Sequence, residues 1–288
     1  MRNKLLSNVS LFLLLSNANL FSLHAKPDTE QKKSKKGGLF SKITLPSIKS
    51  PFSGSITETV SYQKEVPANV SITVANVTGD ITVKAWKNNS VLLEANKKGK
   101  NDDVAATKIS FHKEGNSLTI NTVTSDTKRK PCAVSYTLLV PENCKLESIA
   151  TKNGKISIHN VQNKIVAHTH NGAIEMNNVT GTIETSTKKG EIVINTNTII
   201  PDTRIFAFSE RGKINLSVPK KTDAVLTAET MDGKIESTVA ITTSPQTMKF
   251  NNKTFAQLKQ KADGTIGKGG SASIKLHTKR GNIFVNEV

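Results

Sequence analysis

Two histidines flank one threonine in the stretch AHTHNGAIEMNN, residues 167–178. Histidine is a common zinc ligand, so His168 and His170 are the first candidates for chemistry in this chain. Residues two apart lie on one face of a β-strand, which would place both imidazoles on the same side. Zinc needs a third or fourth ligand nearby, and His159, the nearest candidate, does not converge on the pair. We therefore expect solvent-exposed histidines and no metal site.

Four acidic residues raise the question of polysaccharide cleavage, because some enzymes built on parallel β-helices cut glycans with surface acids and bases. They are Glu191, Glu210, Glu229 and Asp232. A glycosidase needs two carboxyl groups at a defined separation across a cleft, whereas these four fall in different positions of the repeat described below. The chain has no H-E-x-x-H, G-x-S-x-G or G-x-x-x-x-G-K-[ST] motif. The sequence therefore predicts a protein that is not an enzyme and needs no cofactor.

Glycine and isoleucine recur at regular spacing in the second half of the chain. Isoleucine returns every nine residues between Ile156 and Ile192, each time two positions after a glycine or an asparagine. The same step continues at longer intervals, and its principal glycines are Gly154, Gly172, Gly190, Gly212, Gly233 and Gly281. The isoleucines that follow them are Ile156, Ile174, Ile192, Ile214, Ile235 and Ile283. Spacing of this regularity is an internal repeat.

Each repeat has the pattern of a strand, a turn and a second strand. Apolar and polar residues alternate on both sides of the glycine, which is the period of a β-strand. Glycine or asparagine suits the turn because a positive φ costs these residues little. A hydroxyl residue stands three positions before every principal glycine, as Thr169 does before Gly172. Stacked along one edge, these hydroxyls would form a hydrogen-bonded ladder between neighbouring coils.

A unit of nine residues is too short to bury a core alone, so stacking must supply the core. Two units make one coil of about 18–22 residues that advances by one strand spacing, roughly 4.8 Å. We therefore predict an all-β fold, a β-solenoid-like stack of short strands. The alternative is an antiparallel β-sandwich or meander, which explains the alternation but not the recurrence of one residue type in one column.

Three regions of different composition divide the chain. Residues 1–25 have a positive start, a short apolar core and a small residue at the end, which is typical of a secretory signal peptide, whether cleaved or retained. Residues 26–55 carry seven lysines against one aspartate and one glutamate and predict a basic flexible linker. Residues 56–288 form one β-repeat domain with an irregular insertion near residues 240–270. We expect an exported protein of the periplasm, cell envelope or cell surface, with no transmembrane segment beyond the signal.

The sequence contains two cysteines, Cys132 and Cys144. An exported chain permits a disulfide between them. If residues 133–140 are extended, the cysteines lie about 25 Å apart, far beyond bridging distance. A bridge therefore requires the chain to fold back between them, and the sequence leaves both states open.

The chain resembles the bacterial "putative adhesin" domain family. The resemblance rests on NVTGDITVKAW (residues 76–86), VSYTLLVPENCKL (residues 134–146) and T-x-N-G-x-I steps such as TKNGKISI (residues 151–158). It covers most of residues 56–288. The resemblance implies an exported, repeat-rich β domain, and it carries over no catalytic motif.

The chain departs from that family's pattern at two kinds of position. One is the insertion near residues 240–270. The other is the asparagine before the repeat glycine, which is replaced by Lys189, Arg211, Asp232 and Arg280. Any binding role of that asparagine would therefore not carry over to these coils.

Basic residues flank the repeat glycines and would line up along one edge of a stack. They are Lys152, Lys155, Lys188, Lys189, Arg211, Lys213, Lys234, Lys279 and Arg280. With a formal net charge of +17, the chain would attract polyanions. Export and the scarcity of aromatic residues for base stacking argue against nucleic acid. The plain alternative is that the lysines keep a strand-rich protein soluble and block its edges.

These patterns predict a non-enzymatic envelope or surface protein that acts as a binding or adhesion module. The expected partner is an anionic envelope polymer, lipid headgroups or a host surface glycan. A structural or stress-response scaffold that binds another protein is the alternative, and a polysaccharide-active enzyme is the third reading. Salt sensitivity separates the first from the second, because charge-driven binding weakens with ionic strength.

Overall fold

The computed structural model describes residues 41–44, 48–49, 55–125, 131–243 and 260–288. They fall in one compact unit, Gly38–Val288. The expected signal peptide, residues 1–25, lies outside the described residues and stays a prediction. Within the described part of the chain, no helix is both long and apolar enough to cross a membrane.

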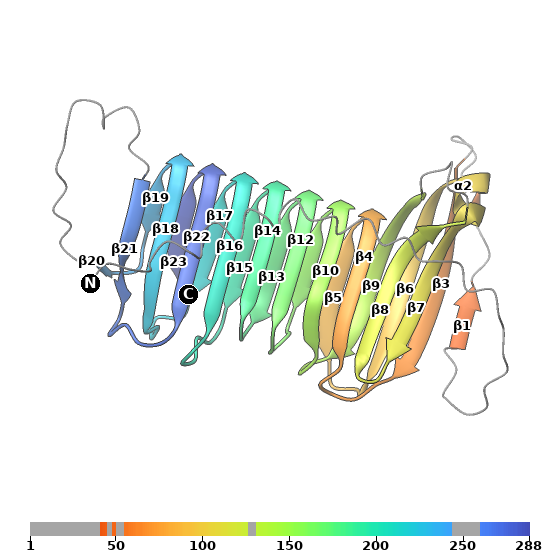
Figure 1. Cartoon of the computed structure of the whole chain (residues 1–288), viewed down its shortest axis with the longest axis horizontal. Helices are drawn as coiled ribbons and strands as arrows, with labels where there is room; N and C mark the ends of the chain where they lie inside the picture. The colour runs from red at the N-terminus through yellow and green to blue at the C-terminus, as the bar shows by residue number, and fades with distance from the viewer. Residues whose placement is uncertain (1–40, 45–47, 50–54, 126–130, 244–259) are drawn as a thin grey trace, which may run out of the picture. The chain divides into compact units, whose positions relative to one another are not determined.

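The strands form two sheets (Figure 1). Sheet A contains β1 (Ser41–Thr44), β2 (Ile48–Lys49), β3 (Ser55–Glu65), β5 (Ile81–Trp86), β6 (Ser90–Lys100), β9 (Ala133–Pro141), β11 (Ile156–His159), β13 (Ile174–Val179), β15 (Ile192–Thr196), β17 (Ile214–Val218), β19 (Ile235–Ser237) and β23 (Ile283–Glu287). Sheet B contains β4 (Ser71–Thr78), β7 (Thr107–Glu114), β8 (Ser117–Thr124), β10 (Lys145–Asn153), β12 (Ile165–Asn171), β14 (Ile183–Lys189), β16 (Arg204–Arg211), β18 (Ala224–Asp232), β20 (Ile241–Thr243), β21 (Gln260–Ile266) and β22 (Ser273–Arg280). A short helix, α2 (Asn101–Ala106), joins β6 to β7.

The repeat region folds as the sequence predicts, with parallel strands stacked in register. In sheet A, Ile174 pairs with Ile156 on one side and with Ile192 on the other. In sheet B, Ile165 pairs with Ile183 in the same way. Each coil therefore passes from a strand of sheet B through the glycine turn to a strand of sheet A. The antiparallel alternative is wrong for these strands.

The core lies between the inner faces of the two sheets, where stacked isoleucines are shielded from water. Ile156, Ile174, Ile192, Ile214 and Ile283 are all 0% exposed. Burial of one such side chain contributes about 1.5–3 kcal/mol, which a single coil could not obtain without its neighbours. Ile235 holds the same column but is half-buried, because its strand, β19, is the last in sheet A.

The predicted hydroxyl ladder is present along the glycine turns. Thr169 donates a hydrogen bond of 3.1 Å from Oγ1 to the carbonyl oxygen of Gly154 in the neighbouring coil. The same bond joins Thr151 to Gly79, Thr187 to Gly172, Ser209 to Gly190, Thr278 to Gly212 and Thr230 to Gly281. Asn76 takes the hydroxyl's place in an earlier coil and donates from Nδ2 to the carbonyl oxygen of Val134 at 2.7 Å. Each of these carbonyls therefore receives a side-chain hydrogen bond from the next coil.

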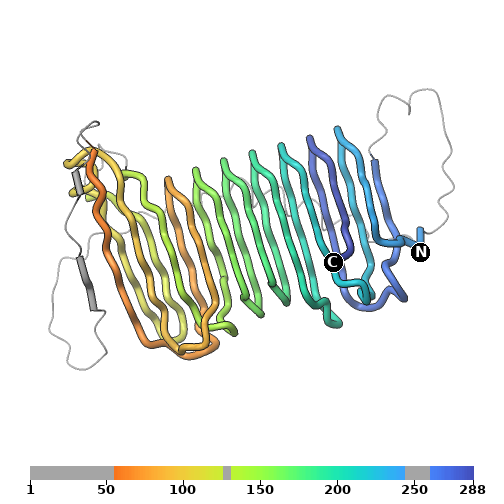
Figure 2. Tube along the Cα trace, turned by 180° about the vertical axis from the view of Figure 1, so that it is seen from behind, coloured from red at the N-terminus to blue at the C-terminus, as the bar shows by residue number. Residues whose placement is uncertain are grey.

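The coils are not stacked in the order in which the chain makes them. Strand β22 lies between β16 and β18, and β23 lies between β17 and β19. Figure 2 shows this insertion, with the dark blue C-terminal strands between teal and lighter blue neighbours. At the other end, β4 lies between β8 and β10, and β5 between β9 and β11. At both ends, a coil is inserted between two others that are consecutive in the chain.

Antiparallel strands complete the two ends of the stack. At one end, β3 and β6 pair with each other and β6 pairs with β9, while β7 pairs with β8. At the other end, β21 pairs with both β18 and β20. Strands β20 and β21 belong to the expected insertion near residues 240–270, and residues 244–259 lie outside the described residues. Strands β1 and β2 lie within residues 26–55, which we expected to form a linker, and both pair with β3.

No disulfide joins Cys132 and Cys144, since both cysteines are free and buried. They stand before and after β9, whose nine residues extend over about 30 Å. The chain does not fold back between them, which was the condition for a bridge. Burial raises the pKa of the Cys144 thiol to about 12.

Candidate functional site

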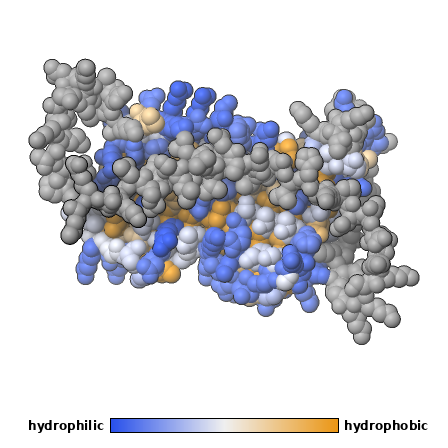
Figure 3. Space-filling model, in the orientation of Figure 1, coloured by the Kyte–Doolittle hydropathy of each residue, from blue (hydrophilic) through white to orange (hydrophobic). Residues whose placement is uncertain are grey.

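The cations beside the repeat glycines lie along one edge of the stack, because the glycine turns of successive coils are stacked there. Each turn follows the end of a sheet B strand, so the residues before and after the glycine lie along one side of the stack (Figure 1). We call this side the basic edge. Figure 3 shows hydrophilic side chains along the top of the view, where β14, β16 and β22 end. Lys234 is exposed at the turn between β18 and β19.

Three cations occupy one position on three adjacent strands of the basic edge. Lys189 of β14 pairs in register with Arg211 of β16, and Arg211 pairs with Arg280 of β22. Neighbouring strands lie about 4.8 Å apart, so the three charges form a closely spaced row. We call Lys189, Arg211 and Arg280 the basic column. Asp232 of β18 holds the next position beside Arg280.

The basic column has no carboxylate partner among the residues that the structure describes. Asp232 is the neighbour in register with Arg280, yet the two form no ion pair. In earlier coils the same position holds Asn153 and Asn171, whose side chains bond to each other at 2.7 Å. Replacing these self-pairing amides by cations leaves the charged groups of the column available to a ligand.

Three other predicted cations already have a carboxylate partner. Lys155 pairs with Glu175 at 2.5 Å, Lys213 with Glu191 at 3.1 Å, and Lys279 with Glu210 at 3.8 Å. We call Lys155, Lys213 and Lys279 the paired lysines. The hydrogen bond from Lys155, followed by one from Asn177, lowers the pKa of the Glu175 carboxyl. Sequence position alone could not separate these lysines from the basic column.

His170 lies in the row of the basic edge that also holds Lys152 and Lys188. It is exposed, and partial desolvation together with the charges of Lys188, Lys152 and Lys189 lowers its pKa. His170 is therefore neutral at pH 7, and the lysines supply the charge of this row.

The two histidines that could have formed a metal site have separate environments. Only His170 is exposed; the expectation that both are exposed is wrong for His168, which is half-buried. The Nδ1 atom of His168 lies 2.8 Å from the Ser186 hydroxyl, and burial lowers the pKa of this imidazole. His159 belongs to β11 in sheet A, whereas His168 and His170 belong to β12 in sheet B. Across the described residues, no three histidine, cysteine or acidic side chains gather in a group that could hold a metal ion.

The four acidic residues considered for catalysis do not converge. Glu191 and Glu210 are engaged by the paired lysines, and Glu229 lies 3.8 Å from His277. Asp232 ends β18 at the basic edge. The two hollows described next are lined by other residues.

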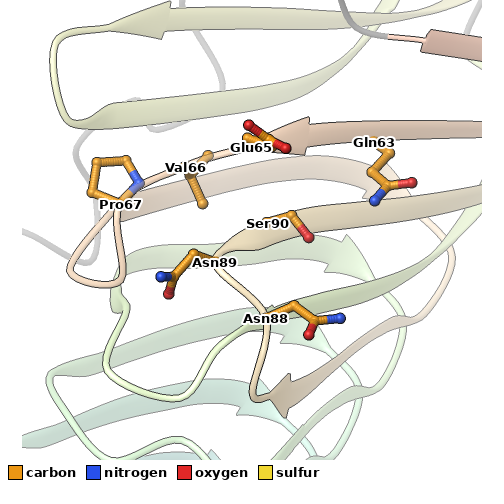
Figure 4. A pocket seen from close by; sticks show the side chains of 7 residues that line it. All are labelled: Gln63, Glu65, Val66, Pro67, Asn88, Asn89 and Ser90. Atoms are coloured by element: carbon orange, nitrogen blue, oxygen red, sulfur yellow. The ribbon is translucent and has the colours of Figure 1, made fainter.

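Those hollows lie beside the turn between β5 and β6, where sequence reasoning placed no site. The larger one, of about 630 Å³, is lined by Gln63, Glu65, Val66, Pro67, Asn88, Asn89 and Ser90 (Figure 4). The smaller one, of about 160 Å³, is lined by Ala68, Trp86, Lys87, Asn89, Pro141, Glu142 and Asn143. The single tryptophan of the chain, next to a K-N-N-S turn, was the signal that could have drawn attention here.

Comparison with solved structures finds relatives that share little sequence with this chain. A "putative cell adhesion protein" from Clostridium sporogenes is 10% identical, with a TM-score of 0.46, and the match covers 79% of this chain and 99% of the other. A "putative adhesin" from Bacteroides fragilis is 15% identical, with a TM-score of 0.41 and coverage of 80% and 97%. A "putative lipid binding protein" from Parabacteroides distasonis is 10% identical, with a TM-score of 0.28 and coverage of 80% and 96%. No curated protein matches the chain.

A family model covers nearly all of the chain. The model, described as Toastrack DUF4097, matches residues 29–286. This range includes the whole repeat region and both sets of antiparallel end strands. The resemblance inferred from the T-x-N-G-x-I steps is confirmed, and the chain belongs to the Toastrack DUF4097 family.

Proposed function

We propose that this protein is an exported, non-enzymatic module of the cell envelope or cell surface that binds an anionic polymer. In this proposal the polymer contacts the basic column, whereas a general attraction by net charge would involve no particular residues. The observation that carries the proposal is that Lys189, Arg211 and Arg280 are adjacent in register without forming an ion pair among the described residues. The flanking Lys188 and Lys152 extend the charge along the same edge.

A regular row of cations suits a polymer better than a small ligand. Each exposed cation contributes a weak contact, because water and salt screen its charge. A polymer that carries anionic groups along its length engages several such contacts at once, so their effects combine. Phosphate-bearing and carboxylate-bearing envelope polymers or surface glycans have this chemistry. Arginine adds a planar, bidentate donor group that fits both kinds of anion.

Co-sedimentation of the full chain with isolated bacterial outer membranes and cell walls tests this proposal. The column variant carries Lys189→Ser, Arg211→Ser and Arg280→Ser. The control variant carries Lys155→Ser, Lys213→Ser and Lys279→Ser, which remove the same formal charge from the same edge. Circular dichroism of both variants verifies that they fold.

The proposal predicts retention of the wild type at low salt and release at high salt. The column variant should stay in the supernatant, while the control variant sediments like the wild type. Equal sedimentation of all three proteins at both salt concentrations would contradict the proposal and favour a scaffold that binds another protein. Loss of wall or membrane polysaccharide during incubation would instead indicate an enzyme.

A further inference from the structure

Two adjoining hollows lie on the edge opposite the basic edge, and Trp86 lines the smaller one. Strand β5 begins after the glycine turn at Gly79 and ends at Trp86, so this residue lies at the far end of the coil. Asn89 lines both hollows and joins them. We call this surface the Trp86 hollow. Figure 4 shows its larger part, built from the end of β3, the loop that follows it and the turn before β6.

Side-chain amides in the Trp86 hollow are free, although amides elsewhere on the same edge are paired. Asn178 donates to Asn160 at 2.7 Å, and Asn197 donates to Asn178 at 2.5 Å, which forms a ladder along the outer turns. By contrast, no described residue forms a hydrogen bond with the side chains that face the hollow from Gln63, Glu65, Asn88, Asn89, Glu142 and Asn143. These groups offer several donors and acceptors within one concave surface.

Trp86 gives the smaller part of the hollow a restrained apolar wall. Its indole Nε1 donates a hydrogen bond of 2.8 Å to the carbonyl oxygen of Ser90, which satisfies its polar atom and restrains the ring. The side chain is half-buried and does not belong to the main core between the sheets. The exposed part of the ring lines the smaller part of the hollow, where a ligand could contact it.

The charged residues that line the hollow offer an anionic ligand no excess of cations. Glu65 and Glu142 line it with a single cation, Lys87. A polyanion would meet two carboxylates here, whereas an uncharged ligand can accept hydrogen bonds from the amides and donate them to the carboxylates. An indole wall beside amide and carboxylate groups matches a sugar ring, which has apolar C–H faces and a rim of hydroxyls.

We propose that the Trp86 hollow binds an uncharged sugar unit of a glycan. The indole of Trp86 packs against the C–H face of the ring, while Asn89 and Asn143, which line the same part of the hollow, bind its hydroxyls. The site is separate from the basic column, uses different residues and has the opposite charge preference. Its existence therefore does not depend on polyanion binding at the other edge.

Tryptophan fluorescence tests the proposal directly, because the chain has one tryptophan and its emission reports on this hollow alone. The full chain is titrated to millimolar concentrations with neutral oligosaccharides of glucose, mannose, galactose and N-acetylglucosamine, and with dextran sulfate as the anionic probe. The same titrations are made with the double variant Asn89→Ala and Asn143→Ala. The control is Asn197→Ala, which removes an amide of the outer ladder on the same edge.

We expect a saturable change of emission with at least one neutral oligosaccharide, insensitive to added salt. The double variant should bind that sugar about tenfold more weakly, as expected for one or two lost hydrogen bonds, and the control should bind it normally. An unchanged emission with every neutral sugar would overturn the proposal. So would a sugar affinity that the double variant retains in full. Failure of the basic column to bind dextran sulfate would leave this result unaffected.

Discussion

At the scale of single residues, neighbouring coils are held together by a glycine and a hydroxyl residue of one coil that both contact the same carbonyl oxygen of the next. A Cβ atom built on Gly172 would lie 1.9 Å from the carbonyl oxygen of Gly154, with φ at +157°. The hydroxyl of Thr169 bonds to the same oxygen from the next coil. The glycine leaves room for this carbonyl oxygen and the hydroxyl donates a hydrogen bond to it. The two residue types therefore recur together in the sequence.

The first prediction concerns the close approach of the glycine turns. Gly172→Ala should lower the free energy of unfolding by about 3 kcal/mol or more, because a backbone oxygen cannot move away cheaply. Gly115→Ala is the control: its φ is +54° but no atom lies within 4 Å of the added Cβ. That variant should lose only about 1 kcal/mol. Urea denaturation measures both, and equal losses would show that the contact with Gly154 does not matter.

The second prediction concerns a hydroxyl buried without a partner. Thr185 is 0% exposed, and its Oγ1 forms no hydrogen bond within the described part of the chain. Thr185→Val should raise the free energy of unfolding by about 1 kcal/mol, because a methyl group replaces an unsatisfied polar group of similar size. Thr169→Val, which removes a ladder hydrogen bond, should lower it by a similar amount. Thermal or urea denaturation that moves both variants in the same direction would contradict this account.

The third prediction concerns the two cysteines. Burial raises the pKa of both thiols, so neither forms the reactive thiolate in the folded protein at pH 8. Native protein should resist iodoacetamide, while protein unfolded in urea without reductant should take up two equivalents, one at Cys132 and one at Cys144. Mass spectrometry counts the adducts. Unfolded protein that takes up none would reveal a disulfide and refute the free-thiol structure.

At the scale of elements, the exchanged order of coils makes the C-terminus a structural part of the stack. Strands β22 and β23 fill the space between the coil of β16 and β17 and the coil of β18 and β19. Both neighbouring coils form backbone hydrogen bonds with these C-terminal strands. An internal coil of the regular repeat is one of several equivalent units, so its neighbours can pair with each other when it is removed.

The fourth prediction compares two deletions of equal length, each of 18 residues. Removal of residues 271–288 deletes β22 and β23 and should abolish cooperative thermal unfolding or lower the melting temperature sharply. Removal of residues 172–189 takes out one full period and joins Asn171 to Gly190. This second protein should still unfold cooperatively, because the columns stay in register. Circular dichroism on heating distinguishes the two, and a tolerated C-terminal deletion would contradict the role given to β22 and β23.

The sequence predicted which residues share a column but not the order of the coils. Ile214, Ile235 and Ile283 have the same spacing from their glycines, so the pattern fits any order of their strands. Likewise, position beside a glycine predicted that Lys213 and Arg211 lie on one edge. It could not show that Glu191 pairs with Lys213 while Arg211 stays unpaired, because these contacts cross between coils. The Trp86 hollow was missed because most of the residues that line it belong to loops after β3, β5 and β9, which are not part of the repeated glycine step.

At the scale of the whole stack of strands, two edges with different chemistry run along the same fold. The glycine turns form the basic edge, and the turns at the other ends of the coils carry asparagine ladders and the Trp86 hollow. The two proposals therefore place an anionic polymer and an uncharged sugar on separate surfaces of the same stack. The strand spacing of the repeat places the basic column, the paired lysines and the asparagine ladder.

The affinity for dextran sulfate at increasing sodium chloride tests the central claim most directly, with wild type, column variant and control variant compared. We predict that wild-type affinity falls steeply with salt and that the column variant binds at least about tenfold more weakly at low salt. The control variant, with the same change in formal charge, should follow the wild type. Equal weakening of the two variants would mean that net charge, rather than the unpaired column of Lys189, Arg211 and Arg280, attracts the polymer, and would contradict the account.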